Sequence, residues 1–456
     1  MRRLSALKHA LLRERTLGGR PTRASTPASR RRRERGVALI AVMVAISIVL
    51  VLSNDFGTTT NIDLMAAANY RDQMRSHFLA RSAVNLAELV IRIQQKLEAS
   101  PLGSSGFRIT DFADQVLLAF CGSPEEVQAA IGLSSSEAKG LGADVGTCGI
   151  TGSISTDDDK INLNCANGND ANAKAVKAMI DALLASPAYD PVFEEADAEG
   201  YRRDRATQAA ALVDYVDSDT ARVRERGTTE DYGYESLRDA YKPKNNYIDS
   251  IGELRLIRGV DDRFWTLFGS AFTAYGKCQV NLGSLTNSQL IAALLAYAAK
   301  NPNDPVLQDP QKLFALAGLV AKAKGFGMSF AKVADFVDFV RDPVGKLGLT
   351  AGAGGLAGSA ASAALSAGLP GTQGGQKLGL ELDAGKLGAV ATTGKRVTYR
   401  VEAWGEVDRK QRGADGAPVF PPIRTTITGV WDTGVTPQNA RKPSGLKGAW
   451  VFSKED

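Results

Sequence analysis

Five of the carboxylates in one 18-residue stretch form a group of potential metal ligands: Asp214, Asp217, Asp219, Glu230 and Asp231. Calcium takes six to eight oxygen ligands and tolerates irregular geometry, so an acidic stretch of this kind favours a calcium site. The spacing differs from that of the twelve-residue EF-hand loop. Capping of a helix end by Asp217 or Asp219, with the remaining acids solvated, explains the same residues without a metal.

A second and weaker acidic cluster is formed by Asp157, Asp158 and Asp159, which precede an alternating, strand-like segment. A surface hairpin explains these residues as well as a metal site does. The chain has two histidines, and His9 lies in a basic leader that we expect to be removed. With only His77 left, a Ser/His/Asp or Cys/His hydrolase has a single candidate base, and a His-rich metal site is excluded. We therefore predict no catalytic residue and no enzymatic activity.

The four cysteines, Cys121, Cys148, Cys165 and Cys278, allow three disulfide connectivities in an exported region. Cys165 ends one predicted strand and Cys278 precedes another. A bond between them would fasten the block of predicted helices in between to a sheet and would leave Cys121 to pair with Cys148. The local Cys148–Cys165 pair is the main alternative. Zinc is disfavoured because the sequence has no Cys-x-x-Cys pair.

Charge is distributed unevenly along the chain. Residues 1–36 contain twelve Lys and Arg against two acids, whereas the rest of the chain contains 43 bases and 48 acids. The overall charge of +5 therefore comes from the N-terminal segment. A nucleic-acid surface needs positive charge clustered on the folded domain. The acidic remainder argues against nucleic-acid binding.

Sixteen uncharged, mostly apolar residues, Val37–Leu52, follow the arginine-rich segment directly. A helix of this length spans about 24 Å, slightly less than a typical transmembrane helix. The preceding arginines predict an N-terminus in the cytoplasm. Apolar residues then recur at helical spacing, namely Met74, Phe78, Leu79, Leu86, Leu89, Val90, Ile93 and Leu97. We predict one continuous helix over residues 37–98, apolar first and amphipathic afterwards.

A basic leader that ends in Gly36 and is followed at once by such a helix resembles the type IV pilin and pseudopilin class. In that class the prepilin peptidase cuts after the glycine, so the resemblance implies cleavage between Gly36 and Val37. The fifth mature residue would be Ala41, where most of the class has a glutamate that neutralises the terminal amine of the next subunit. An uncompensated ammonium in hydrocarbon is costly, so such a subunit suits a repeating shaft poorly.

Residues 153–295 narrow the resemblance to the large minor pseudopilin of type II secretion, the GspK family. The segments that carry it are SISTDDDKINLN (153–164), ALVDYVDSD (211–219), GTTEDYGYESL (227–237), YKPKNNYIDSIGELRLIRGV (241–260) and QVNLGSLTNSQLIAALL (279–295). Tyr215 stands where the family commonly has a tryptophan, and residues 300–390 match little.

The resemblance implies a non-enzymatic subunit at the tip of the pseudopilus, taking part in the export of folded proteins across the outer membrane. It also implies a single-pass protein of the bacterial inner membrane with its C-terminal domain in the periplasm. The implied partners are the minor pseudopilins of the I and J type, the major pseudopilin, the prepilin peptidase and membrane lipid. Calcium is the implied cofactor. The alternative is a membrane-anchored minor pilin, or a DNA-uptake or adhesion module, of a type IV pilus-like system.

We predict an α+β fold in which a long N-terminal helix packs on an antiparallel sheet that carries a large inserted all-α domain. Residues Val397–Val407 and Ile423–Trp431 alternate with a period of two and predict a hairpin. The predicted order is a removed leader (1–36), a transmembrane helix (37–56), its amphipathic continuation (57–100), a first part of the pilin β region (101–165), the inserted helical domain (166–277), a strand plus a helical segment (278–345), a Gly/Ala-rich linker (346–377) and C-terminal strands of the pilin sheet (378–456).

Overall fold

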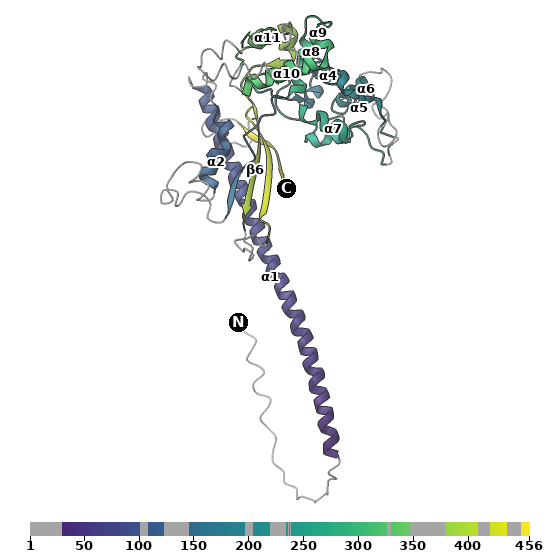
Figure 1. Cartoon of the computed structure of the whole chain (residues 1–456), viewed down its shortest axis with the longest axis vertical. Coiled ribbons are helices and arrows are strands. Elements are labelled where there is room, and N and C mark those ends of the chain that lie inside the picture. Colours follow the sequence, from purple (N-terminus) through teal and green to yellow (C-terminus); the bar gives the residue numbers. More distant parts are fainter. Residues whose placement is uncertain are drawn as a thin grey trace, which may run out of the picture. The chain divides into compact units, whose positions relative to one another are not determined.

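The structure is a computed structural model that describes residues 30–100, 108–122, 146–196, 204–218, 234–235, 237, 239–325, 330–343, 345–346, 379–408, 420–435 and 448–456 (Figure 1). Three predicted calcium ligands, Asp219, Glu230 and Asp231, lie outside these residues. Most of the leader and of the Gly/Ala-rich linker also lies outside them. The chain divides into two compact units, Met1–Arg71 and Asp72–Asp456, and each is treated separately below.

The described part of the first unit is the N-terminal portion of helix α1 (Arg30–Ala99). Its apolar segment satisfies the backbone hydrogen bonds internally, as a membrane-spanning segment must. An 18-residue window in α1 has a mean hydropathy of 2.7, and none of it is buried against the rest of the protein. By length and composition, α1 is able to cross a membrane, as the apolar run in the sequence predicts.

The second unit contains an antiparallel sheet in which the strand order is β1-β6-β7-β8. The strands are β1 (Thr147–Ile150), β6 (Thr398–Val407), β7 (Ile423–Asp432) and β8 (Ala449–Glu455). β6 and β7 pair along their whole length, from Thr398 opposite Asp432 to Val407 opposite Ile423. The predicted hairpin is therefore present, and β1 and β8 extend it on either side.

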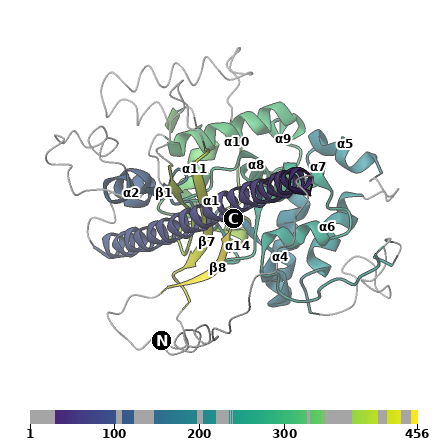
Figure 2. The ribbon, with the colours of Figure 1, turned by 90° about the horizontal axis from the view of Figure 1, so that it is seen from below.

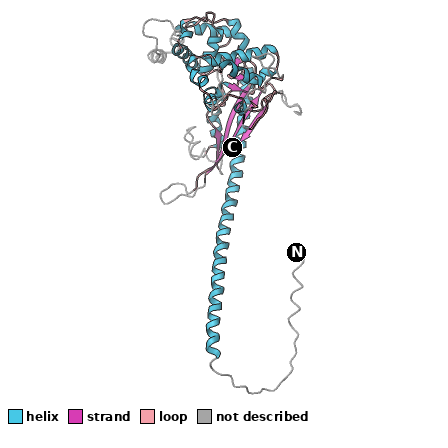
Figure 3. Cartoon of the chain, turned by 90° about the vertical axis from the view of Figure 1, so that its right-hand side faces the viewer, coloured by secondary structure: helices cyan, strands magenta, loops and turns pink. Residues whose placement is uncertain are grey.

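The part of α1 in this unit lies along the sheet (Figure 3). Small side chains of the helix make the contact. Ala80, Ala83 and Ala87 are fully buried along one face of the helix. Gly405 of β6 comes so close to α1 that a Cβ atom there would lie 2.2 Å from the Ser76 carbonyl oxygen. Close approach of the two backbones thus requires small residues on both surfaces. Larger side chains fill the core beside this contact, including Ile91, Leu117 of helix α2 (Ala113–Cys121), Tyr399, Val401 and Trp431.

Two stretches of chain supply the helices of the second core (Figure 2). The first contains α4 (Asp170–Leu184), the 3₁₀ turn η4 (Pro187–Tyr189), α5 (Asp190–Glu194), α6 (Arg205–Asp214), the 3₁₀ turn η5 (Ile251–Leu256) and α7 (Asp262–Phe268). The second contains α8 (Ser288–Ala298), α9 (Pro305–Gln308), α10 (Pro310–Gly325), α11 (Val333–Arg341) and α14 (Ala384–Val390). Their buried residues form one apolar cluster, which we call the helical core. The predicted α+β fold is confirmed.

Local capping explains where several of these helices begin. The side chains of Asn169, Asp204 and Asp261 accept hydrogen bonds from the free backbone N–H groups at the starts of α4, α6 and α7. Ser250 and Glu253 form a reciprocal capping box at the start of η5. These polar residues immediately precede apolar, helix-forming segments, so the sequence marks the helix starts closely.

The segments that flank the inserted domain differ from expectation, because they are not strands of the four-stranded sheet. β2 (Ile161–Asn162) pairs in parallel with β3 (Phe272–Thr273), and β4 (Val280–Asn281) pairs with β5 (Ala391–Thr392). The side-chain oxygen of Asn162 accepts a hydrogen bond from Asn164 N, and that of Asn281 accepts one from Gly283 N. These side-chain turns bend the chain after two residues and end each strand.

The predicted C-terminal block of strands also begins differently. Leu380, Leu382, Leu387 and Val390 are buried in the helical core rather than in the sheet. The chain therefore returns to the helices before it enters β6, and the strands of the pilin-like sheet begin only at Thr398.

Candidate functional site: the anchor helix and the acidic residues

The N-terminal part of α1 presents apolar side chains on all sides. Val37 is 68% exposed, and residues 37–52 carry no charged side chain. The one hydroxyl in this stretch, Ser47 Oγ, donates a hydrogen bond to the Met43 carbonyl oxygen at 2.8 Å, so it is satisfied within the helix. Ala41 offers no carboxylate. This surface suits lipid or other apolar helices, and residues 37–52 contain nothing that would neutralise a buried amine.

In the second unit, α1 has two different faces. Alanines face the sheet, whereas Met74, Phe78, Leu89 and Ile93 are between 37% and 58% exposed on the side away from it. We call these four residues the exposed stripe. Large apolar side chains exposed along one helix face mark a surface that another protein can cover.

The structure describes two of the five predicted calcium ligands. Asp214 is the last residue of α6, Asp217 follows within one turn, and both side chains are buried. Asp219, Glu230 and Asp231 lie outside the described residues. Within the part of the chain that is described, no group of three His, Cys, Asp or Glu side chains is arranged to hold a metal ion. Two neighbouring buried carboxylates are compatible with a calcium site but do not make one alone.

The second acidic cluster has a structural role, beginning with Asp157. This carboxylate is fully buried and accepts hydrogen bonds from Arg400 Nε at 3.0 Å, Lys160 Nζ at 2.7 Å and Thr273 Oγ1 at 3.1 Å. Burial alone would raise its pKa, but the bonds and positive charges of Arg400 and Lys160 outweigh that effect and hold the pKa below its ordinary value. Through these hydrogen bonds, the ionised Asp157 carboxylate links the acidic turn to strands β6 and β3.

Asp158 also forms hydrogen bonds to strand β6. Its carboxylate accepts a hydrogen bond from Thr398 Oγ1 at 2.8 Å and further bonds from the backbone N–H groups of Val397 and Thr398. Its carbonyl oxygen accepts a bond from Asn281 N at 2.7 Å. One residue thus joins the start of β6 to β4 beside the helical core. We call the arrangement around Asp157 and Asp158 the acidic junction.

Asp159 differs from its neighbours because the fold gives its carboxylate little stabilisation through hydrogen bonds. Its Oδ1 atom is buried and has no hydrogen-bond partner within the described residues. Burial raises its pKa from 3.8 to about 6, although Lys160 opposes the shift. The ionised form of Asp159 therefore opposes folding at neutral pH, whereas that of Asp157 favours it.

Both disulfides favoured by the sequence analysis are present in the structure. Cys165 is bonded to Cys278, with Cα atoms 5.5 Å apart, and closes a loop with a sequence separation of 113. Cys121 is bonded to Cys148 across a separation of 27. The first bond fastens both ends of the inserted helical segment together beside the acidic junction, and the second fastens α2 to β1.

The sequence analysis missed the residues that complete the acidic junction. Arg400 occupies a polar position in the alternation of β6, and nothing near it in the sequence indicates that it meets a carboxylate 243 residues away. His77, the remaining histidine, pairs through Nδ1 with Glu455 of β8 at 2.6 Å. That pair lies on an exposed surface between α1 and the edge of the sheet.

Comparison with known proteins finds a family match within this chain. The sequence profile for the first domain of "Type II secretion system (T2SS), protein K" matches residues 159–275. The type II secretion system protein K of Aeromonas hydrophila is 23% identical over 273 residues, which cover 59% of this chain and 72% of that protein. Residues 159–275 of this chain are therefore similar to the first domain of the type II secretion protein K family.

A solved structure is also similar to this chain. It is the crystal structure of the GspK–GspI–GspJ complex from the type 2 secretion system of enterotoxigenic Escherichia coli. The match covers 80% of this chain and 99% of the chain in that structure, with 15% sequence identity and a TM-score of 0.40.

The protein K profile coincides with the inserted helical segment. It begins at Asp159, in the acidic turn, and ends at Tyr275, three residues before Cys278. The acidic junction and the Cys165–Cys278 disulfide therefore lie at the two ends of the family-specific domain, where the chain leaves and rejoins the pilin-like part.

Proposed function

We propose that this protein is a minor pseudopilin at the tip of the type II secretion pseudopilus and that it takes part in the export of folded proteins across the outer membrane. The observation that carries this proposal is a protein K domain, residues 159–275, joined to a pilin-like helix and sheet. Ala41 supports the terminal position, because a subunit without a carboxylate there cannot neutralise the amine of a neighbour in the shaft. The inserted helices would also obstruct a subunit stacked above.

The direct test is to label the protein at its C-terminus in cells that overproduce pseudopili. Electron microscopy should then find the label once, at one end of each fibre, and deletion of the gene should stop export. Label distributed along the fibres would contradict the tip position, and normal export without the gene would contradict the secretion role.

Processing and membrane location form the next part of the proposal. The leader is cut after Gly36, and the apolar helix anchors the mature chain in the inner membrane with the rest in the periplasm. Replacing Gly36 by leucine should leave the leader attached, because a bulky side chain obstructs the peptidase. Gly57→Leu is the matched control, since a Cβ at Gly57 meets no atom within 4 Å. A Gly36→Leu protein of mature size on a gel would show that cleavage occurs elsewhere.

The exposed stripe is the surface we assign to the other minor pseudopilins, of the I and J type, and to the major pseudopilin. Phe78→Glu or Leu89→Glu should reduce co-purification of these partners by at least tenfold, because a charge would replace an apolar contact. Lys174→Glu changes charge at an exposed position on α4, outside helix α1, and serves as the control. Equal losses in all three variants would count against a specific stripe contact.

Calcium is proposed as the cofactor, bound by Asp214, Asp217, Asp219, Glu230 and Asp231. Support comes from the density of carboxylates and from the burial of the first two at the end of α6. No enzymatic role is proposed, because the mature chain offers a single histidine and that residue pairs with Glu455. The alternative of a DNA-uptake or adhesion module is not favoured, since the family match is to a secretion component.

A further inference from the structure

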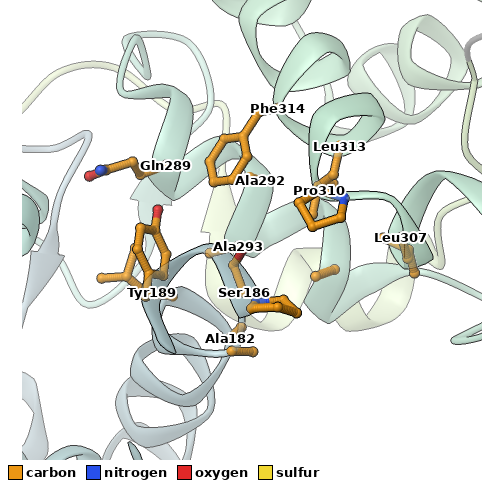
Figure 4. Close-up of a pocket in the computed structure, with 14 residues that line it drawn as sticks. Ala182, Ser186, Tyr189, Gln289, Ala292, Ala293, Leu307, Pro310, Leu313 and Phe314 are labelled. Carbon is orange, nitrogen blue, oxygen red and sulfur yellow. The ribbon is translucent and has the colours of Figure 1, made fainter. Parts of the chain in front are cut away.

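A small pocket of about 100 Å³ lies within the second unit, among the helices of the helical core (Figure 4). Its walls come from the end of α4, from η4, from α8 and from the α9–α10 region. The lining is mainly apolar and includes Leu183, Pro187, Leu307, Leu313 and Phe314. No charged side chain lines it, so the pocket excludes ionic ligands.

The pocket exists because three helices meet where α8 contributes three alanines to the lining. Ala292, Ala293 and Ala296 of α8 face the pocket, and none of them reaches across to α4 or α10. Pro187 and Pro310 stand at the starts of η4 and α10, where proline fixes the backbone but adds little volume. The sequence thus leaves a space that a larger residue on α8 would have filled.

Two polar groups in the lining, the Tyr189 hydroxyl and the Gln289 carboxamide, are open to solvent. The Tyr189 side chain is buried, with 7% exposure, and its ring is held against Phe268 and Phe314 at centroid distances of 4.8 and 6.3 Å. Its hydroxyl group and the carboxamide of Gln289 make no hydrogen bond within the described chain. Burial raises the pKa of Tyr189 to about 12, so its hydroxyl stays a neutral donor. A neutral donor beside a carboxamide matches the hydrogen-bonding groups of a peptide bond.

The volume limits the apolar part of the ligand. An apolar cavity of about 150 Å³ binds benzene, which has six carbon atoms. A pocket of about 100 Å³ therefore suits about four carbon atoms, the size of a leucine side chain. The lining excludes charge and the volume excludes a large ring system. The two solvent-facing polar groups are able to hydrogen-bond to a peptide group next to the aliphatic side chain.

We propose that this pocket binds a leucine-sized aliphatic side chain of another polypeptide and that Tyr189 and Gln289 hydrogen-bond to the peptide group next to it. The site lies in the helical core, apart from the exposed stripe, so it adds a second contact surface. The proposal does not depend on the tip position or on the secretion role.

Photocrosslinking of the full-length protein in detergent tests the site directly. The probe is an N-acetylated, C-amidated Gly-X-Gly tripeptide in which X is a diazirine analogue of leucine. Crosslinks mapped by mass spectrometry should concentrate on α8 and the start of α10, and excess Gly-Leu-Gly should compete at least tenfold better than Gly-Asp-Gly. Crosslinks spread evenly over the protein, or equal competition by both peptides, would overturn the proposal.

Two variants make the test specific to the pocket. Ala296→Leu fills the pocket from its half-buried wall and should reduce labelling at least tenfold, whereas Ala315→Leu, half-buried on α10 outside the lining, should not. Thermal melting checks that both variants fold.

Gln289→Ala keeps the apolar volume, removes one polar group and should weaken labelling about fivefold, as expected for the loss of one hydrogen bond. This variant also covers the case in which Ala296→Leu fails to fold. Unchanged labelling of Gln289→Ala, together with isobutanol competing as well as Gly-Leu-Gly, would overturn recognition of a peptide.

Discussion

The acidic turn at residues 157–159 and the acidic stretch that begins at Asp214 look alike in the sequence, yet the fold treats them differently. In the turn, Asp157 and Asp158 meet donors from β6, a strand that lies more than 230 residues further along the chain. In the second stretch, Asp214 and Asp217 are buried at the end of α6, and Asp219, Glu230 and Asp231 lie outside the described residues. The comparison shows that a high density of carboxylates does not by itself distinguish acids that stabilise the fold from acids that bind a metal. The decisive factor is whether the fold brings a cation or a hydroxyl opposite the acids.

The strongest test of this contrast removes the disulfide beside the acidic junction. Replacing Cys165 and Cys278 by serine should lower the free energy of unfolding by about 5 kcal/mol, because a loop of over 100 residues is released in the unfolded state. The matched variant without Cys121 and Cys148 should lose about 3.5 kcal/mol, since its loop is shorter. Guanidinium titration of both measures the difference. If the Cys165/Cys278 variant lost less stability than the Cys121/Cys148 variant, the acidic junction would be holding the inserted domain in place without the Cys165–Cys278 disulfide.

The second test breaks the acidic junction itself. Arg400→Met should destabilise the protein by about 3 kcal/mol, because it leaves the buried Asp157 carboxylate with less positive charge. Arg424 occupies an exposed position on the neighbouring strand β7 and pairs with Glu406 at the surface. Arg424→Met should therefore lower the free energy of unfolding by under about 1 kcal/mol. The double variant Asp157→Asn/Arg400→Met should recover part of the loss, as no charge is left buried. Equal effects of the two arginine variants would remove the distinction between a buried tie and a surface pair.

The third test uses pH to distinguish the contribution of Asp159 to stability from that of Asp157. Folding raises the pKa of Asp159 from 3.8 to about 6, so the folded state binds its proton more tightly and the ionised group costs stability. Asp159→Asn should match the wild type below pH 4 and become more stable as pH rises, by about 2 kcal/mol above pH 6.

Asp157 has the opposite sign, since its lowered pKa gives stability that is present above pH 4 and is lost as pH falls through its folded pKa. Urea titrations from about pH 2 to 7.5 measure both effects. An Asp159→Asn curve parallel to that of the wild type over the whole range would show that Asp159 is not the responsible group.

The smallest expected effect concerns calcium at the second acidic stretch. If the five acids bind the ion, calcium at ten times its dissociation constant should stabilise the protein by about 1.4 kcal/mol, and EDTA should reverse this. Asp217→Asn should abolish the calcium-dependent gain, whereas Asp159→Asn should retain it. Thermal melts with calcium and with EDTA provide the measurement. An equal gain in both variants would place any calcium outside this stretch.

Local patterns were sufficient for several parts of the fold. The capped helix starts at Asn169, Asp204 and Asp261 follow from neighbouring residues, and the β6–β7 hairpin follows from alternation. The short strands β2 and β4 were wrongly assigned to the main sheet because alternation over a few residues does not specify a partner strand. The extra helical segment at residues 384–390 was missed because glycine and alanine give it a weak helical signal.

By itself, the sequence determined the basic N-terminal segment, the apolar segment of α1, the helices between Cys165 and Cys278 and the β6–β7 hairpin, because each of these is a property of contiguous residues. The tertiary structure alone decided that Asp157 pairs with Arg400, that Asp159 Oδ1 is buried without a hydrogen-bond partner among the described residues, and that three helices line a pocket beside Tyr189. The physical reason is that charge pairing, burial and cavity shape depend on which distant segments meet. No local sequence pattern specifies which distant segments come into contact.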